Sequence, residues 1–113
     1  ERCGIYPINH CLMIHQDIFT KNPMLGYSLF KAYSKSKEKA LKRKLGSTFL
    51  PWADRQWPDV IELFNNDPYP HGLTKSNVKN IEKLINYLFE QRLIKDKPTI
   101  DDLFPMESHQ WRE

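Results

Sequence analysis

The sequence predicts an α/β fold that is mostly helical in this chain, with one N-terminal strand followed by three main helices. Residues 5–15 show the alternation and the apolar run of a strand. Helix-start signals stand at Asn22 and Thr74, and apolar residues recur at helical spacing after each of them. Together these patterns indicate helices that pack against a sheet.

The predicted strand has no visible partner in this chain. Its apolar run from Cys11 to Ile14 is typical of a strand covered on both faces by helices. Pro7 lacks an N–H and interrupts the hydrogen-bond ladder near it. A sheet needs several strands, and no downstream stretch has comparable strand character. We therefore expect residues 1–113 to be a single partial domain, the C-terminal segment of a larger protein, which associates with itself or with a missing partner segment.

The first predicted helix starts at Asn22 and Pro23, because asparagine is a good N-cap residue and proline suits the first helical position. Basic residues near Lys44 suit the negative end of the helix dipole, and Gly46 closes the helix. The following residues are expected on its buried side: Leu25, Leu29, Tyr33, Ala40 and Leu41.

Two further helices are predicted downstream. After a linker over residues 47–52, apolar spacing predicts a helix over residues 54–64. The breaker-rich residues 65–72 predict a loop. Thr74 caps the third helix. Its core stripe should contain Val78, Ile81, Ile85 and Leu88, widened by Leu84 and Phe89.

The C-terminal part predicts little regular structure. Thr99 and Asp102 form a variant of the capping box and open a short helical turn. Pro105 stops this turn. Residues 106–113 are polar and predict a flexible tail.

The positive charge of the chain, +3 overall, is concentrated in one block. Seven basic residues lie between Lys31 and Lys44, and Lys35, Lys39 and Lys42 share one helical face. The block predicts a solvated helix face. A small nucleic-acid-binding module is the third and weakest functional hypothesis, since such surfaces need more basic clusters and exposed aromatic residues. We therefore expect no nucleic-acid partner.

The two cysteines predict free, mostly buried thiols. On one extended strand Cys3 and Cys11 would lie about 26 Å apart, beyond the reach of a disulfide. Free thiols fit a reducing compartment. No apolar run is long enough for a membrane span, and no signal peptide precedes Cys3. We expect a cytoplasmic protein, with a periplasmic or extracellular location as the alternative if an upstream signal peptide exists.

Among the four histidines, His10 is the best candidate for chemistry because it lies in the strand beside Asn9 and close to Tyr6. Imidazole titrates near neutral pH and serves as a general acid. A strand histidine is also often a hydrogen-bonded structural residue. His71, in the loop before the third helix, is a weaker candidate for ligand binding. Neither metal-ligand spacing nor a phosphate-binding glycine loop is present, so we expect no metal site.

The order of motifs resembles the C-terminal part of 4,5-dihydroxyphthalate decarboxylase-like proteins. The resemblance is carried by Gly4-Ile-Tyr-Pro-Ile-Asn-His-Cys-Leu-Met-Ile14, by Asn22-Pro23, by Leu29-Phe30-Lys31-Ala32-Tyr33, by Asp67-Pro-Tyr-Pro-His-Gly-Leu73 with Asn77, and by Glu90-Gln-Arg-Leu93. It extends from about residue 4 to Phe104. Members of the family often carry an aromatic residue where His71 stands.

The resemblance implies the C-terminal portion of a type II periplasmic-binding-protein fold, in which two α/β lobes enclose a ligand cleft. It implies an aromatic-acid decarboxylase with His10 as the catalytic acid or carboxylate donor, and Tyr6, Asn9 and His71 as ligand-binding residues. The alternative is a non-catalytic substrate-binding protein of an ABC-type transporter. In both cases the expected partner is a small aromatic or anionic ligand, and a homo-oligomer is compatible with either.

Overall fold

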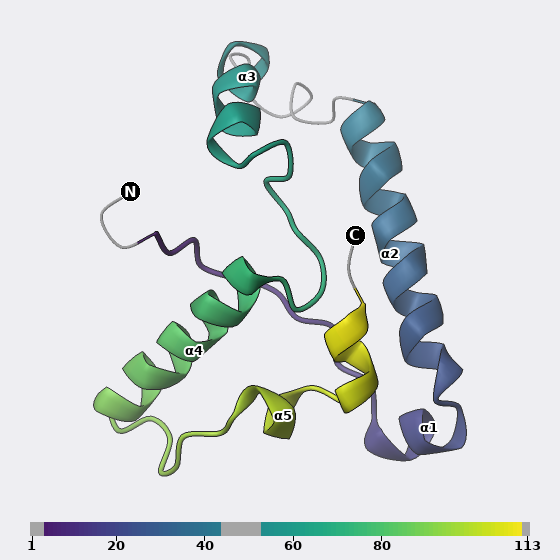
Figure 1. Cartoon of the computed structure of the whole chain (residues 1–113), viewed down its shortest axis with the longest axis vertical. Coiled ribbons are helices and arrows are strands. Elements are labelled where there is room, and N and C mark those ends of the chain that lie inside the picture. Colours follow the sequence, from purple (N-terminus) through teal and green to yellow (C-terminus); the bar gives the residue numbers. More distant parts are fainter. Residues whose placement is uncertain (1–3, 44–52, 112–113) are drawn as a thin grey trace.

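The computed structural model describes residues 4–43 and 53–111 as a series of helices joined by extended segments and turns (Figure 1). In chain order the helices are α1 (Gln16–Lys21), α2 (Met24–Lys42), α3 (Ala53–Leu63), α4 (Lys75–Glu90), α5 (Ile100–Leu103) and the 3₁₀ helix η2 (Met106–Gln110). The three predicted main helices are therefore present as α2, α3 and α4. The predicted linker over residues 47–52 lies outside the described residues.

The prediction of an α/β fold is wrong for the part of the chain that the structure describes. Residues 5–15 are extended, but they pair with no strand among the residues that the structure describes. The amides of residues 8–14 donate no hydrogen bond to any described residue. Alternation and apolar runs favour an extended backbone, whereas a strand also needs an edge with which to pair. The corrected fold class is mostly α, with an extended N-terminal segment.

Several side chains of the extended segment are exposed, although the sequence predicts that they are covered. Leu12 is 57% exposed and Met13 is 90% exposed. Cys11 is a free and exposed thiol, so the prediction that it is buried is wrong, and Cys3 lies outside the described residues. With no sheet around the segment, Leu12 and Met13 stay open, whereas Ile5, Ile8 and Ile14 are half-buried.

A short helix that the sequence did not predict precedes α2. His15 is the N-cap of α1, and its Nδ1 accepts a hydrogen bond from the amide of Asp17 at 3.3 Å. Asn22, predicted as the N-cap of the first main helix, instead caps the C-terminus of α1, where its N–H donates to the carbonyl of Ile18. Pro23 is the N-cap of α2 and makes no side-chain cap bond. The helix-start signal is therefore one residue early.

The caps of α4 and α5 are formed as predicted. The Oγ1 of Thr74 accepts from the amide of Asn77 at 3.2 Å. In α5 the Thr99 amide donates to the carboxylate of Asp102 and the Thr99 Oγ1 accepts from the Asp102 amide, so the two residues form a capping box. The Thr99 hydroxyl also donates to that carboxylate. The backbone hydrogen bond from Thr99 and then the side-chain one lower the pKa of Asp102. The stability that this cap contributes is therefore fully present above the ordinary carboxyl pKa. It is lost as the pH falls through the lowered pKa of Asp102.

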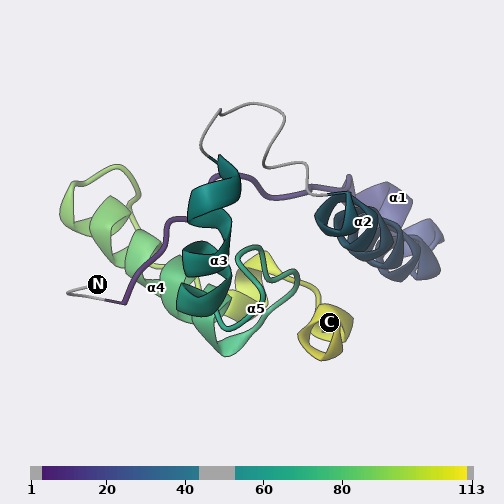
Figure 2. The ribbon, with the colours of Figure 1, turned by 90° about the horizontal axis from the view of Figure 1, so that it is seen from above.

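The chain is open rather than compact. Its helices spread around the extended segment and do not stack into layers (Figure 1, Figure 2). The radius of gyration is 16.4 Å, against about 13 Å for a compact domain of this length. The accessible surface is 9724 Å², about half as much again as the roughly 6,500 Å² of a compact monomer of this mass.

The buried core is correspondingly small. Among the described hydrophobic residues only Leu73 and Ile85 are buried, each 8% exposed. Of the predicted core residues, Tyr33 and Leu84 are about half exposed. The apolar stripes of the helices thus have the predicted spacing, while much of their surface lacks a covering layer.

The C-terminal residues, where the sequence predicts a flexible tail, pack against α2. The Trp111 ring lies 6.0 Å from the Tyr27 ring and 5.9 Å from the Phe30 ring, centroid to centroid. A Cβ atom on Gly26 would lie 2.6 Å from the Trp111 ring, so only glycine admits this close approach. Ser108 in η2 is buried. The segment from η2 to Trp111 therefore fastens the C-terminal part of the chain to the long helix.

Candidate functional site

Tyr6 anchors the predicted site segment to the helices. Its amide donates a hydrogen bond of 3.2 Å to Oδ1 of Asn80, a side chain of α4 that is buried at 7% exposure. Its ring packs edge-on against Phe64, with ring centroids 4.9 Å apart and an interplanar angle of 74°. The buried carboxamide of Asn80 needs such a partner, because leaving a buried polar group unpaired costs about 1–3 kcal/mol. The N-terminal segment is therefore fixed between the end of α3 and the first half of α4.

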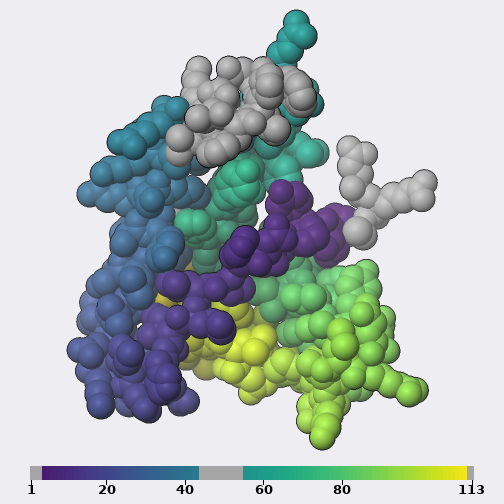
Figure 3. Space-filling view, turned by 180° about the vertical axis from the view of Figure 1, so that it is seen from behind, coloured from purple at the N-terminus to yellow at the C-terminus, as the bar shows by residue number. Residues whose placement is uncertain are grey.

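The predicted residues of this segment are all open to solvent. Tyr6 is 52% exposed, and Asn9 and His10 are exposed as well. Seen from behind, the N-terminal segment runs along the surface over the neighbouring helices (Figure 3). A ligand could therefore reach the side chains of Asn9 and His10 directly.

The loop that carries His71 is held by side chains at both of its ends. Oδ1 of Asp67 accepts from the amide of Tyr69 at 3.2 Å. The carboxamide nitrogen of Asn77 donates to the carbonyls of Pro70, at 2.7 Å, and Gly72, at 2.8 Å. His71 is half-buried within this loop. These bonds tie the loop backbone on both sides of His71 to Asp67 and Asn77.

Lys37, in the described part of the basic block, joins this loop to α2. The Nζ of Lys37 lies 3.1 Å from Oδ1 and 3.2 Å from Oδ2 of Asp67, and 3.0 Å from the carbonyl of Tyr69. Its side chain is only 13% exposed. Lys37 therefore has a structural role that the solvated-face interpretation of the block missed.

Replacing Lys37 with methionine is expected to lower the free energy of unfolding by about 1–3 kcal/mol, because it removes hydrogen bonds to a charged group in a half-buried place. The matched control changes Lys35, Lys39 and Lys42 together to glutamine. All three are exposed, and such surface changes stay within about 0.5 kcal/mol. Urea unfolding measures both. Equal losses in the two variants would contradict the assigned role of Lys37.

Two anchoring side chains of α4 bring the site segments together. Asn77 holds the His71 loop and Asn80 holds the Tyr6 amide. Residues three apart in a helix lie on the same face, about 4.5 Å apart along the axis. One face of α4 near its N-terminus thus positions both the N-terminal segment and the His71 loop.

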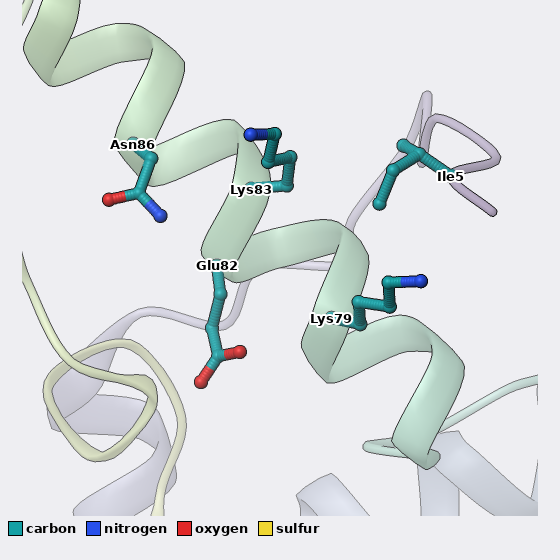
Figure 4. A pocket seen from close by; sticks show the side chains of 5 residues that line it. All are labelled: Ile5, Lys79, Glu82, Lys83 and Asn86. Carbon is teal, nitrogen blue, oxygen red and sulfur yellow. The ribbon is translucent and has the colours of Figure 1, made fainter. Parts of the chain in front are cut away.

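A pocket of about 340 Å³ lies along the same helix. It is lined by Ile5, Lys79, Glu82, Lys83 and Asn86. Lys79 and Lys83 project from the side of α4 that faces Ile5, whereas Glu82 projects from another side (Figure 4). The Nζ of Lys83 also lies 4.7 Å from the centre of the Tyr87 ring. Two ammonium groups one turn apart suit a carboxylate, and the volume is at the lower end for ligand pockets.

The structure does not bring His10 to this pocket. His10 follows Ile5 by five residues on an extended segment, which corresponds to about 17 Å along the chain. A single aromatic ring with its substituents does not span that distance. The candidate site therefore has two parts, the exposed Asn9 and His10 and the pocket that contains the two lysines.

Sequence reasoning missed the residues that build this site. Lys37 and Asp67 are thirty positions apart, and no local pattern pairs them. Asn80 interrupts the apolar stripe of α4, and a polar residue in a core stripe is a signal of a buried hydrogen bond. Lys79 and Lys83 stand one helical turn apart, which predicts a shared face.

Within the described ranges no group of three or more His, Cys, Asp or Glu side chains is placed to hold a metal ion. Nor does any helix in those ranges have the length and apolar character to cross a membrane. Comparison of the chain with protein-family models, with curated proteins and with solved structures found no match in any of the three.

Proposed function

We propose that this chain is part of a decarboxylase that acts on a dihydroxylated aromatic acid, with His10 as the acid. The anchoring of Tyr6 is the observation that carries the proposal. The bond from its amide to Asn80 holds the segment by its backbone, and Asn9 and His10 remain exposed to a ligand. The motif order from residue 4 to Phe104, which resembles 4,5-dihydroxyphthalate decarboxylase-like proteins, supplies the substrate class.

The reaction needs one proton and a hold on the substrate. His10 in its protonated form gives a proton to the ring carbon that bears the carboxylate, and a C–H bond forms there. The C–C bond to the carboxylate then breaks, its electron pair returns to the ring, and carbon dioxide leaves. Tyr6 and Asn9 serve as hydrogen-bonding groups beside the ring. General acid catalysis of this kind contributes about 10²–10⁴ in rate.

The loop motif supports the same proposal through its architecture. Asp67, Gly72 and Asn77, which carry part of the resemblance, form the bonds and the turn that shape the His71 loop. Residues of a motif that build a loop are expected where the loop must present a ligand-binding side chain in one place. We assign this task to His71. We place the protein in the cytoplasm, where an exposed thiol such as Cys11 stays reduced.

Carbon dioxide release from 4,5-dihydroxyphthalate tests the proposal. His10→Gln in the full-length protein is expected to reduce turnover by about 10²–10⁴ and to leave ligand affinity within a few fold. The matched control is His15→Asn, since His15 is exposed on the same segment and asparagine also caps helices. Unchanged turnover in His10→Gln would remove His10 from catalysis, and loss of folding would assign it a structural role.

A second candidate, ligand binding without catalysis, is favoured by the separation between His10 and the lysine pocket. An anionic aromatic ligand held by Lys79 and Lys83 would not touch His10 in this conformation. In that case 4,5-dihydroxyphthalate binds without releasing carbon dioxide, and Lys79→Gln weakens binding while His10→Gln does not.

A further inference from the structure

The extended segment contains seven consecutive residues with free backbone donors. The amides of residues 8–14 donate to no described residue, and the segment contains no Asp, Glu, Lys or Arg. Leu12 and Met13 are 57% and 90% exposed. An extended, neutral and apolar run with an unpaired backbone is a template for pairing with another strand.

The limits of this run are symmetric about Cys11. Pro7, at one end, has no N–H and ends a ladder. His15, at the other end, caps α1, where the chain turns into helix. When two such segments pair antiparallel with Cys11 opposite Cys11, residue 8 of each copy lies opposite residue 14 of the other. Each end of the ladder then stops at Pro7 of one copy and at the start of α1 in the other.

We propose that two copies of this chain associate by antiparallel pairing of residues 8–14, centred on Cys11. In this register Ile8 faces Ile14, and Asn9 faces Met13. His10 faces Leu12, and no like charges meet. The pairing is isologous, as in most two-fold dimers.

The side chains that the pairing would cover are exposed in the single chain. Leu12 and Met13 are 57% and 90% exposed, and Asn9, His10 and Cys11 are exposed as well. In the proposed ribbon directly opposite residues share a side, so residues 8, 10, 12 and 14 of both copies lie on one face. This face of the ribbon is apolar. This face provides the hydrophobic contact that an isolated two-stranded ribbon lacks.

The proposal does not depend on the decarboxylase function, but it affects the position of His10. The two His10 side chains would lie on the same face, diagonally across the ribbon and about 7–8 Å apart. A substrate on that face would meet imidazoles from both copies.

Position-specific cross-linking of the 113-residue chain tests the register. In the Cys3→Ser variant Cys11 is the remaining thiol, and oxidation by copper–phenanthroline is expected to give a covalent dimer rapidly. Directly opposite Cα atoms lie about 4.5–5.5 Å apart, within disulfide reach. The matched control carries Cys3→Ser, Cys11→Ser and Met13→Cys. Its thiols would be about 14 Å apart in the proposed register, so it is expected to form little dimer.

Sedimentation at several concentrations tests the association itself. The unmodified chain is expected to reach dimer mass. With the two Cys11 residues as a non-hydrogen-bonded pair, the amide of Leu12 donates to the carbonyl of His10 in the other copy, so Leu12→Pro removes a ladder bond and is expected to remain monomeric. Circular dichroism checks that this variant keeps its helices. A monomer at all concentrations, a dimer that withstands Leu12→Pro, or equal cross-linking from positions 11 and 13 would each overturn the proposal.

Discussion

Replacing Gly72 with alanine is expected to lower the free energy of unfolding by about 2–5 kcal/mol. Gly72 has a φ of +82°, and its added Cβ would lie 2.2 Å from the carbonyl oxygen of Trp111. The left-handed backbone costs a side chain about 1–2 kcal/mol, and a clash with a fixed backbone atom adds about 1–3 kcal/mol. Chemical denaturation followed by Trp fluorescence measures the loss.

Gly4→Ala is the matched control for this change. Gly4 also has a positive φ, of +60°, but the nearest atom to an added Cβ is the end of the Lys79 side chain at 3.1 Å. A flexible side chain moves aside, so only the backbone cost of about 1–2 kcal/mol remains. Equal losses in the two variants would contradict the close packing of Trp111 against the His71 loop.

Replacing Ile85 with alanine is expected to cost about 2–5 kcal/mol, because it leaves a cavity in the small core. Ile85 is 8% exposed. Its neighbour Leu84 is 50% exposed, so Leu84→Ala is expected to cost clearly less and serves as the control. Thermal and urea unfolding of the two variants measure the difference. Similar losses would mean that the chain in solution buries the other face of α4.

The local rules of helix formation predicted the helices of this chain well. Thr74 and Thr99 cap the helices that the sequence assigned to them. The side chain of each supplies a hydrogen bond that does not depend on distant residues. The sequence did not predict α1, because its N-cap is His15 and histidine is not among the residue types preferred at the N-cap.

Pairing between distant segments could not be predicted in the same way. Residues 8–14 favour an extended backbone by themselves, but a ladder depends on a second strand that no described residue provides. Lys37 looks like its neighbours in the basic block, and only the folded chain places it against Asp67.

For the candidate site, the sequence names residues and the structure adds how their segments are held. Tyr6, Asn9, His10 and His71 are candidates by residue type, and Asn77 and Asn80 fix the segments that carry His71 and Tyr6. A side-chain carboxamide that bonds a distant backbone has no local signature beyond a polar residue in an apolar stripe. The anchoring residues therefore became visible only with the fold.

Titration of the full-length protein with 4,5-dihydroxyphthalate, followed by nuclear magnetic resonance of backbone amides and histidine rings, tests the proposed function most directly. The proposal predicts saturable shifts at Tyr6, Asn9 and His10 and at the His71 ring, with little change at His15, which lies on the same segment but serves as a helix cap. No saturable shift at His10, or shifts confined to residues outside the N-terminal segment and the His71 loop, would contradict it.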